Sequence, residues 1–408
     1  MPAKIVILGA GFAGLWSALA AQRLINLANQ TDNIKVLVIA PSATLVLRPR
    51  LYEADAGNMT HSLGPLFAAT GIEFCPGTAQ SIDSDARIVR MQSIDGLQHG
   101  VPYDRLIVAT GSSVVQPQSI SGLRQHAFDV DSLESAAKLD AHLAALQSLS
   151  PSPARDTVVV CGAGFTGIEL AAELPKRLSH IANVQVILVD RAEDFGPELG
   201  PGPRPVIAQA LGEVGVECRL GSGIQAVDAD GVALMSGERI ATRTAIWTAG
   251  VRATPLTQQI PGPKDPLARV FVDEWLRAPS AEHIFVTGDA ACAMADSEGH
   301  YALMSCQHAL QLGRVAGHNA AADLLAESMV KYSQAAYLCC LDLGGWGAVI
   351  SGSWERHVQM SGEVAKRVKC YINQKLIYPP EDGDEALRAA NPVGPGSDEL
   401  LQQILQVV

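Results

Sequence analysis

The sequence is poor in charged residues and has no long basic run. Charged residues make up 18% of the 408 residues, and acidic residues outnumber basic ones 42 to 30, which gives a net charge of -12. Proteins that bind nucleic acids gather Lys and Arg on one face or in one segment. We therefore expect no nucleic-acid partner.

Long apolar segments are also missing. No stretch offers the roughly 20 apolar residues of a membrane-spanning helix. Residues 1–4 lead directly into the apolar run 5–8, which leaves no room for a signal peptide. One nearly uncharged segment, 335–354, carries Asp342 and several glycines, which favours strands and turns over a spanning helix.

The eight cysteines form no metal-binding or disulfide pattern. They are scattered, no two stand in a Cys-x-x-Cys arrangement, and only Cys339 and Cys340 are close in sequence. We predict no metal site and no disulfide framework. A reducing, cytoplasmic compartment is the expectation from this usage. Cys161 and Cys218 each fall in an apparent strand and are expected to be small core residues.

What the sequence does contain is enough apolar material for large buried sheets. Apolar residues make up 48%, and the mean hydropathy is +0.16 at a mass of 43.0 kDa. A chain of this length usually forms two or three domains.

One pattern occurs twice, about 150 residues apart. Residues 5–14 and 158–167 each consist of four apolar residues, a glycine cluster and the start of an Ala/Leu-rich stretch with helical spacing. Further strand patterns follow at 35–39 and 185–189. Each copy therefore predicts a strand, a tight turn, a helix and a second strand. This pattern predicts an α/β fold with two Rossmann-like domains.

The glycine spacing in each copy fits a dinucleotide-binding turn. The first glycine permits the sharp turn, the second lets the backbone approach a pyrophosphate, and the third lets the helix pack on the strand. The helix N-terminus adds free N–H groups and a positive dipole end. Two such turns predict two bound dinucleotides. The glycines concerned are Gly9, Gly11 and Gly14 in the first copy, and Gly162, Gly164 and Gly167 in the second.

The residue after the second strand distinguishes the two copies. In the second copy it is Asp190, whose carboxylate would accept hydrogen bonds from a ribose and repel the 2'-phosphate of NADPH. NADH is therefore favoured, although the neighbouring Arg191 leaves NADPH as an alternative. In the first copy the position is Ala40. Arg48 is then a candidate for nucleotide contacts, with an ordinary surface arginine as the other interpretation.

The order of five motifs resembles a known family. Residues 9–14, 103–112, 162–167, 246–251 and 287–290 are similar to the two-dinucleotide-binding flavoproteins of the pyridine nucleotide-disulfide oxidoreductase superfamily. Within it, the order is most similar to the type II NADH:quinone oxidoreductases. Residues 48–57 also resemble the Gln-Pro-Leu-Leu-Tyr-Gln-Val-Ala-Thr-Gly segment of that group. The similarity covers about residues 3–325.

The resemblance implies a discontinuous FAD domain with an inserted NAD(P)H domain. The expected boundaries are 1–115 and 283–330 for the FAD domain, 116–156 for a linker, 157–282 for the NAD(P)H domain and 331–408 for a smaller mixed C-terminal subdomain and tail. That subdomain would shape acceptor access or a homodimer contact.

The resemblance also implies the cofactor contacts. FAD would lie on the first turn beside Thr110 and Gly111, with Asp289 at its ribityl chain and Ala79 near the adenine; a helix cap is the other interpretation of Asp289. The complete set of expected cofactor-binding residues is Gly9, Gly11, Phe12, Ala13, Gly14, Arg48, Ala79, Ala109, Thr110, Gly111, Gly162, Gly164, Thr166, Gly167, Asp190, Ala249, Gly250, Gly288 and Asp289.

Three residues are catalytic candidates by resemblance. Residues 306–313 are similar to the stretch that quinone reductases place against the flavin and the acceptor, and Gln307 and Gln311 would share one helix face there. Glu169 matches a family glutamate near the nicotinamide, and Glu173 lies one turn further. A solvated face for the glutamines, and charge complementarity with the helix N-terminus for the glutamates, are the competing interpretations.

The sequence departs from the disulfide reductases of the superfamily. No redox cysteine pair lies between Gly14 and Cys75, so a thiol relay is not expected. Cys306 starts a predicted helix at 302–328, where the dipole could lower a thiol pKa; simple packing is preferred. The C-terminal segment 363–377 carries basic residues, but an acidic tail follows. We therefore expect at most weak peripheral contact with the inner face of a membrane.

Together these features predict an FAD-dependent NAD(P)H dehydrogenase. Hydride would pass from NADH to FAD, and two electrons would then pass to a quinone or similar aromatic acceptor. A reductase of a protein partner such as ferredoxin, and a flavin-bearing signalling protein with slow turnover, are the alternatives.

Overall fold

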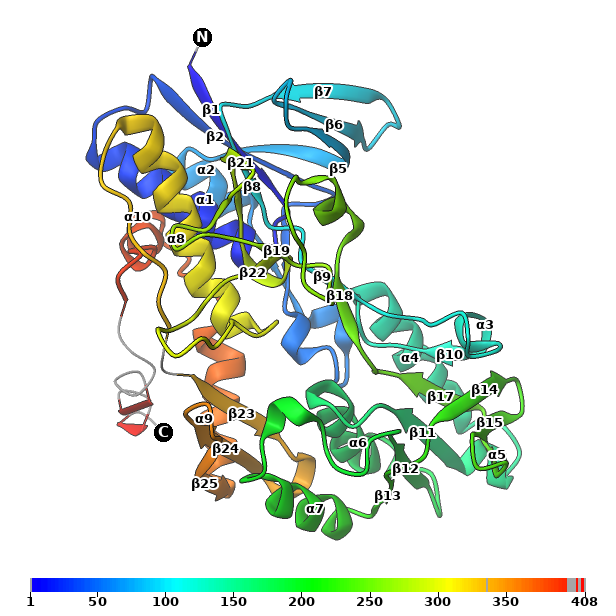
Figure 1. Cartoon of the computed structure of the whole chain (residues 1–408). Helices are drawn as coiled ribbons and strands as arrows, with labels where there is room; N and C mark the ends of the chain where they lie inside the picture. Colours follow the sequence, from blue (N-terminus) through cyan, green and yellow to red (C-terminus); the bar gives the residue numbers. More distant parts are fainter. Residues whose placement is uncertain (1, 335–336, 395–400, 403–404, 407–408) are drawn as a thin grey trace.

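The computed structural model describes residues 2–334, 337–394, 401–402 and 405–406. Part of the tail expected within 331–408 lies outside these residues. Two sheets dominate the described chain, one in the upper and one in the lower half of Figure 1. A smaller antiparallel sheet lies beside them. The predicted α/β class is confirmed.

The first sheet has eight strands. Its order is β20–β21–β8–β1–β2–β5–β6–β7. The five strands from β21 to β5 pair in parallel, and β20, β6 and β7 add antiparallel edges. The strands are β1 (Ala3–Leu8), β2 (Ile34–Ala40), β5 (Glu73–Asp83), β6 (Ile88–Ser93), β7 (Gln98–Pro102), β8 (Arg105–Val108), β20 (Arg277–Ala278) and β21 (Ala281–Val286).

The second sheet is entirely parallel and has five strands. Its order is β10–β17–β11–β12–β13. Residues 158–161 of β11 are nearly inaccessible, as expected for a β-branched strand covered on both faces. The strands are β10 (Ala127–Phe128), β11 (Thr157–Cys161), β12 (Gln185–Val189), β13 (Val216–Arg219) and β17 (Thr244–Trp247).

The helices connect and cover these sheets. The predicted helix over 302–328 is shorter, as α8 (Cys306–Leu325). It begins later because the Ser305 hydroxyl caps it by accepting from the His308 N–H at 3.3 Å. It ends earlier where Ala326 adopts a left-handed conformation with a φ of +57°. The other helices are α1 (Phe12–Leu27), α2 (Gly64–Thr70), α3 (Leu123–His126), α4 (Leu133–Leu146), α5 (Pro153–Asp156), α6 (Phe165–Arg177), α7 (Arg204–Glu213), α9 (Glu363–Tyr371) and α10 (Gly383–Ala389).

The C-terminal part forms a third sheet of β23 (Leu338–Asp342), β24 (Ala348–Gly352) and β25 (His357–Gly362), all antiparallel, with α9 packed on it. Small pairs and a meander complete the fold: β3 (Thr44–Val46) with β4 (Thr60–Ser62), β9 (Ser112–Val114) with β18 (Val251–Ala253), β19 (Val270–Phe271) with β22 (Ala291–Cys292), and β14 (Ile224–Asp228), β15 (Gly231–Leu234) and β16 (Arg239–Ala241).

The chain leaves the first sheet after β8 and returns to it at β20. Residues 277–282 pair there, although we expected the second domain to extend to residue 282. The expected linker 116–156 also supplies β10 to the second sheet. The domain boundaries themselves stay a prediction.

Two cysteines test the expectation of small core residues. Cys161 is buried at the end of β11, as predicted, whereas Cys218 is exposed. Cys218 lies on β13, which is an edge strand, so the prediction for this residue is wrong.

Helices α1 and α8 lie side by side on one face of the first sheet (Figure 1). They approach closely because glycines stand at the contact. A Cβ added to Gly317 would lie 2.0 Å from the carbonyl oxygen of Ser17, and one added to Gly313 would lie 2.5 Å from that of Ala13. This packing holds α8, and therefore its N-terminus, in place over the end of β1.

We predict that Gly317→Ala destabilises the protein by about 1–3 kcal/mol, because the added methyl group must push two helices apart. Gly212→Ala is the matched control, since Gly212 lies in α7 with open space around its Cβ position. That change is expected to be neutral or to stabilise by up to about 1 kcal/mol. Thermal unfolding of both variants checks this. Equal stability of the two variants would contradict the packing argument.

Candidate active site

The first glycine turn joins β1 to α1. Gly9 has a φ of +108°, and a Cβ there would lie 2.4 Å from the carbonyl oxygen of Ala109. Gly14 packs against the Gly9 carbonyl, where a Cβ would be 2.0 Å away. Gly11 has open space instead, at the N-terminus of α1. The backbone therefore leaves room at Gly11 for a phosphate group.

The second turn, between β11 and α6, repeats this arrangement. Gly162 has a φ of +121°, and a Cβ on Gly167 would lie 1.8 Å from the Gly162 carbonyl oxygen. Gly164 again has open space. In both copies, the first, second and third glycines thus occupy the kinds of position that the spacing predicts.

Both turns open into one large cavity of about 2230 Å³. Most of the expected site residues line it, and Gly14 and Gly167 lie behind it in the helix packing. The expected residues on its wall are Gly9, Gly11, Phe12, Ala13, Arg48, Ala109, Thr110, Gly111, Gly162, Gly164, Thr166, Glu169, Asp190, Ala249, Gly250, Gly288 and Asp289.

Besides Gly14 and Gly167, three further expected site residues are not part of this wall. Ala79 pairs with Met91 in the first sheet. Gln311 donates from Nε2 to the carbonyl oxygen of Pro392 at 2.6 Å, so its amide holds the C-terminal segment. Gln307 lies on α8 next to Cys306, which does line the cavity. The acceptor role of the two glutamines stays a prediction, and the cavity geometry does not support it.

Arg48 lines the cavity and is held there by several contacts, and its role in nucleotide binding stays a prediction. It forms an ion pair with Asp131 and lies 3.6 Å from Asp289. It also donates to the Ser112 hydroxyl at 2.8 Å, and Ser112 donates to Asp289 at 2.6 Å. The Asp289 carboxylate is therefore fixed on the cavity wall, where the resemblance implies a ribityl contact.

Asp190 lies at the carboxyl end of β12, and its carboxylate is already hydrogen-bonded. It accepts from the Ala163 N–H at 2.6 Å and from the Ala192 N–H at 2.8 Å. Ala163 belongs to the second glycine turn. The carboxylate thus orients that turn, and since a carboxylate offers about four lone-pair sites, it can still accept from a ribose.

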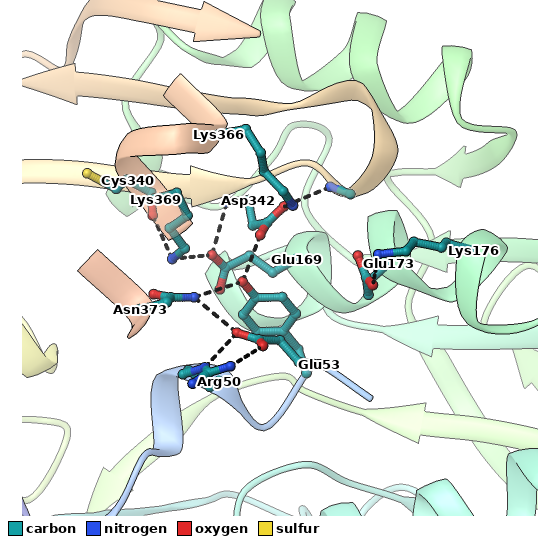
Figure 2. A network of polar contacts seen from close by, with 12 residues as sticks. Arg50, Glu53, Glu169, Glu173, Lys176, Cys340, Asp342, Lys366, Lys369 and Asn373 are labelled. Carbon is teal, nitrogen blue, oxygen red and sulfur yellow. Dashed lines mark hydrogen bonds and ion pairs between the residues drawn. The ribbon is translucent and has the colours of Figure 1, made fainter. Parts of the chain in front are cut away.

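Glu169 lies on α6 inside a buried ion pair (Figure 2). Its carboxylate lies 2.8 Å from Lys369 Nζ, and the two side chains are only 10% and 8% exposed. Glu169 also accepts from the backbone N–H of Asp342 at 3.0 Å, and Lys369 donates to the carbonyl oxygen of Cys340 at 3.0 Å. The pair therefore joins α6 to β23 and α9 at the cavity wall.

Burial and charge shift the pKa values of this pair. Burial raises the pKa of Glu169, and the Lys369 ammonium partly opposes the rise. Burial would lower the pKa of Lys369, but the carboxylates of Glu169 and Asp342 outweigh it and raise that pKa. Lys369 therefore stays protonated at neutral pH, and Glu169 is the member whose charge can change.

Glu173, the second glutamate of the predicted pair, is not on the cavity wall. It lies 3.5 Å from the exposed Lys176 on its own helix and points away from Glu169 in Figure 2. Charge pairing along the helix explains this residue.

Cys306 lines the cavity at the first turn of α8. Burial raises its pKa, although Lys369 opposes the rise. The Cys340 thiol also lines the cavity, and burial raises its pKa to about 12. Both thiols are therefore protonated at neutral pH, which does not favour nucleophilic chemistry.

Sequence reasoning missed the role of Lys369 and Tyr52. Lys369 was interpreted only as one of the basic residues of 363–377, and Tyr52 only as part of the segment 48–57. The signal for Lys369 was a lysine on the apolar side of an otherwise basic helix; α9 buries Ala365, Val368 and Lys369.

Neither a metal centre nor a membrane span is found in the described part of the chain. No group of three or more His, Cys, Asp or Glu side chains there could hold a metal ion. Within the same residues, no helix has the length and apolar character needed to cross a membrane.

Residues 3–313 match the family model of the pyridine nucleotide-disulphide oxidoreductases. The chain belongs to this family. An NADH dehydrogenase-like protein of Mycobacterium tuberculosis is 41% identical over 398 residues, which cover 95% of this chain and 98% of that protein. The demethylphylloquinone reductase of Synechocystis is 26% identical over 386 residues, covering 92% and 91%.

Among solved structures, NDH2 of Plasmodium falciparum in complex with NADH has the same fold. Its TM-score is 0.76 at 15% sequence identity, and the alignment covers 96% of this chain and 98% of that one. The predicted resemblance and the two-domain flavoprotein fold are confirmed.

The protein is thus an oxidoreductase with FAD and NAD(P)H as its cofactors. The residues on the wall fit both groups, because open space lies at Gly11 and at Gly164, at the N-termini of α1 and α6. We expect FAD at the first turn and NAD(P)H at the second.

Replacing Asp190 should change nucleotide preference. Asp190→Ala removes an anionic acceptor and relieves repulsion of a 2'-phosphate, so we expect kcat/KM for NADH to fall roughly tenfold or more while that for NADPH holds or rises. Asp228→Ala, which removes an exposed carboxylate paired with Arg239, is the control. Steady-state kinetics with both nucleotides measure the effect. A wild-type preference for NADPH would contradict the NADH assignment.

Catalysis should not depend on the cavity thiol. Cys306→Ala is expected to retain flavin reduction and turnover within about threefold, since its raised pKa keeps the thiol protonated. Stopped-flow absorbance of both half-reactions tests this. Loss of turnover in a folded, FAD-containing variant would instead indicate a thiol mechanism.

Proposed function

We propose that this oxidoreductase transfers a hydride from NADH to FAD and then passes two electrons to a quinone-like acceptor. The cavity shared by both glycine turns is the main support for this proposal, because it joins the turns to a charged wall. When bound, FAD supplies the two-electron carrier between nucleotide and acceptor. The quinone assignment is supported by the relative of Synechocystis, which is named as a demethylphylloquinone reductase.

The residues of the chain align the reactants and provide charge. The two turns hold the pyrophosphate groups, and Asp289 and Asp190 offer acceptors to hydroxyl groups. The N-terminus of α8 and the Lys369 ammonium place positive potential on the wall formed by Cys306, Tyr337 and Cys340. This potential favours negative charge that develops on an aromatic acceptor or ring system in that part of the cavity.

Glu169 lines the same cavity, and its carboxyl group can carry a transferable proton. Reduction of a quinone takes up two electrons and two protons, whereas NADH supplies a hydride, so one proton must come from elsewhere. The raised pKa of Glu169 keeps a larger share of its carboxyl protonated than in water. We infer that it acts as a proton donor to the acceptor.

Half-reactions measured anaerobically by stopped flow test the function. NADH should reduce the FAD of purified yellow protein, and a soluble naphthoquinone should reoxidise it faster than ferredoxin or oxygen does. Glu169→Gln should slow the reoxidation roughly tenfold or more and leave reduction by NADH nearly unchanged.

Glu173→Gln is the matched control, because the same substitution one helical turn away removes a carboxylate that does not line the cavity. It should leave both half-reactions unchanged. Faster reoxidation by ferredoxin than by the quinone would replace the quinone proposal with that of a protein-partner reductase.

A further inference from the structure

A second ion pair, Asp342–Lys366, lies beside the Glu169–Lys369 pair (Figure 2), and neither of its members lines the cavity. Lys366 Nζ lies 2.5 Å from Asp342 Oδ1, and the Gly344 N–H donates to the same oxygen at 2.9 Å. The Asp342 side chain is 8% exposed and that of Lys366 is 24% exposed. Hydrogen bonds from the protein therefore replace most of the water around the Asp342 carboxylate, whereas the Lys366 side chain remains partly accessible to water.

Asp342 touches both the glutamate and the tyrosine of the cavity wall. Its backbone N–H donates to Glu169, and its Oδ2 accepts from the Tyr52 hydroxyl at 2.9 Å. Burial raises the pKa of Tyr52 well above its ordinary value, and the Glu169 and Asp342 carboxylates add to the rise. Tyr52 is thus a fixed, neutral donor that keeps Asp342 in place.

The contacts also join the segment that contains Tyr52 to the C-terminal part of the chain. Asn373 donates to the Tyr52 hydroxyl at 3.4 Å and to Glu53 at 3.1 Å, and Glu53 pairs with Arg50 at 2.7 Å. Three segments far apart in sequence, 50–53, 169 and 340–373, therefore meet in one network.

The charges of the two ion pairs balance. Two carboxylates face two ammonium groups, so removing one member of the outer pair leaves an uncompensated charge beside a buried carboxyl group. Interactions of this kind are strong where water is excluded. Tyr52, Cys306, Cys339 and Cys340 also face Glu169 and are neutral. The charged groups beyond Tyr52 are Glu53 and Arg50, which pair with each other.

We propose that Asp342 and Lys366 form a positioning ion pair that sets the proton affinity of Glu169. This inference rests on the proposed function only in assigning the proton to acceptor reduction. In that step the Glu169 O–H bond breaks, an O–H bond forms on the acceptor, and the carboxylate left beside Lys369 regains a proton from water. The two electrons come from NADH.

The two members of the outer pair make opposite predictions. Asp342→Asn removes a negative charge that raises the pKa of Glu169, so this pKa should fall. Lys366→Gln removes a positive charge and leaves Asp342 uncompensated, so the pKa of Glu169 should rise. Both variants break the same contact between Asp342 and Lys366. If the pair had a purely structural role, the pKa of Glu169 would therefore shift in the same direction in both variants. The double variant should return toward wild type.

The direct measurement is an infrared pH titration of the protonated carboxyl band that is lost in Glu169→Gln. The midpoint should shift to lower pH in Asp342→Asn and to higher pH in Lys366→Gln. Asp323→Asn and Lys331→Gln remove partners of ion pairs with Arg105 and Glu274, none of which lines the cavity, and should leave the midpoint unchanged.

The same shifts should appear in the pH profile of flavin reoxidation by a naphthoquinone, and not in that of reduction by NADH. Midpoints that stay fixed, or move in the same direction in both variants, would overturn the inference. Opposite infrared shifts without any quinone reactivity would retain the inference and reject the proposed acceptor. The two failures are therefore distinguishable.

Discussion

The wall of the cavity near β23 and α9 depends on the buried pair of Glu169 and Lys369. Each charge loses its hydration, so neither is tolerable in the interior without the other. The pair therefore requires α9 to lie against α6, although some 200 residues separate the two in sequence. The position of α9 in turn fixes β23, which carries the wall residue Cys340 and the neighbouring Asp342.

A buried ion pair of this kind is not a simple source of stability. The cost of removing two charges from water offsets much of their attraction, and apolar replacements often serve stability equally well. Positioning is the stronger explanation here, because both members reach the cavity and both are further hydrogen-bonded. Burying the charges of this network costs hydration free energy, and the resulting contacts hold a titratable carboxyl group at a defined place.

The parts of the site that the sequence predicts are those built by local geometry. A glycine with positive φ, a helix N-terminus and a carboxylate after a strand all lie within about 30 residues of each other, so Gly9, Gly162 and Asp190 could be assigned from spacing alone. Lys369 could not, because its partner lies on another domain. Gln311 shows the converse: helical spacing placed it on the same face as Gln307, but its amide is used by Pro392.

The residues that the family model matches contain the locally built parts of the site. The matched residues 3–313 contain both glycine turns, Asp190, Asp289 and Glu169, which together account for the two cofactors. Tyr337, Cys340 and Lys369 lie beyond that range and yet line the same cavity. The cavity wall therefore combines many residues of the matched range with a few residues of the C-terminal part. If the proposed acceptor binds at that part of the wall, we expect changes in β23 or α9 to affect its reduction more than hydride transfer from the nucleotide.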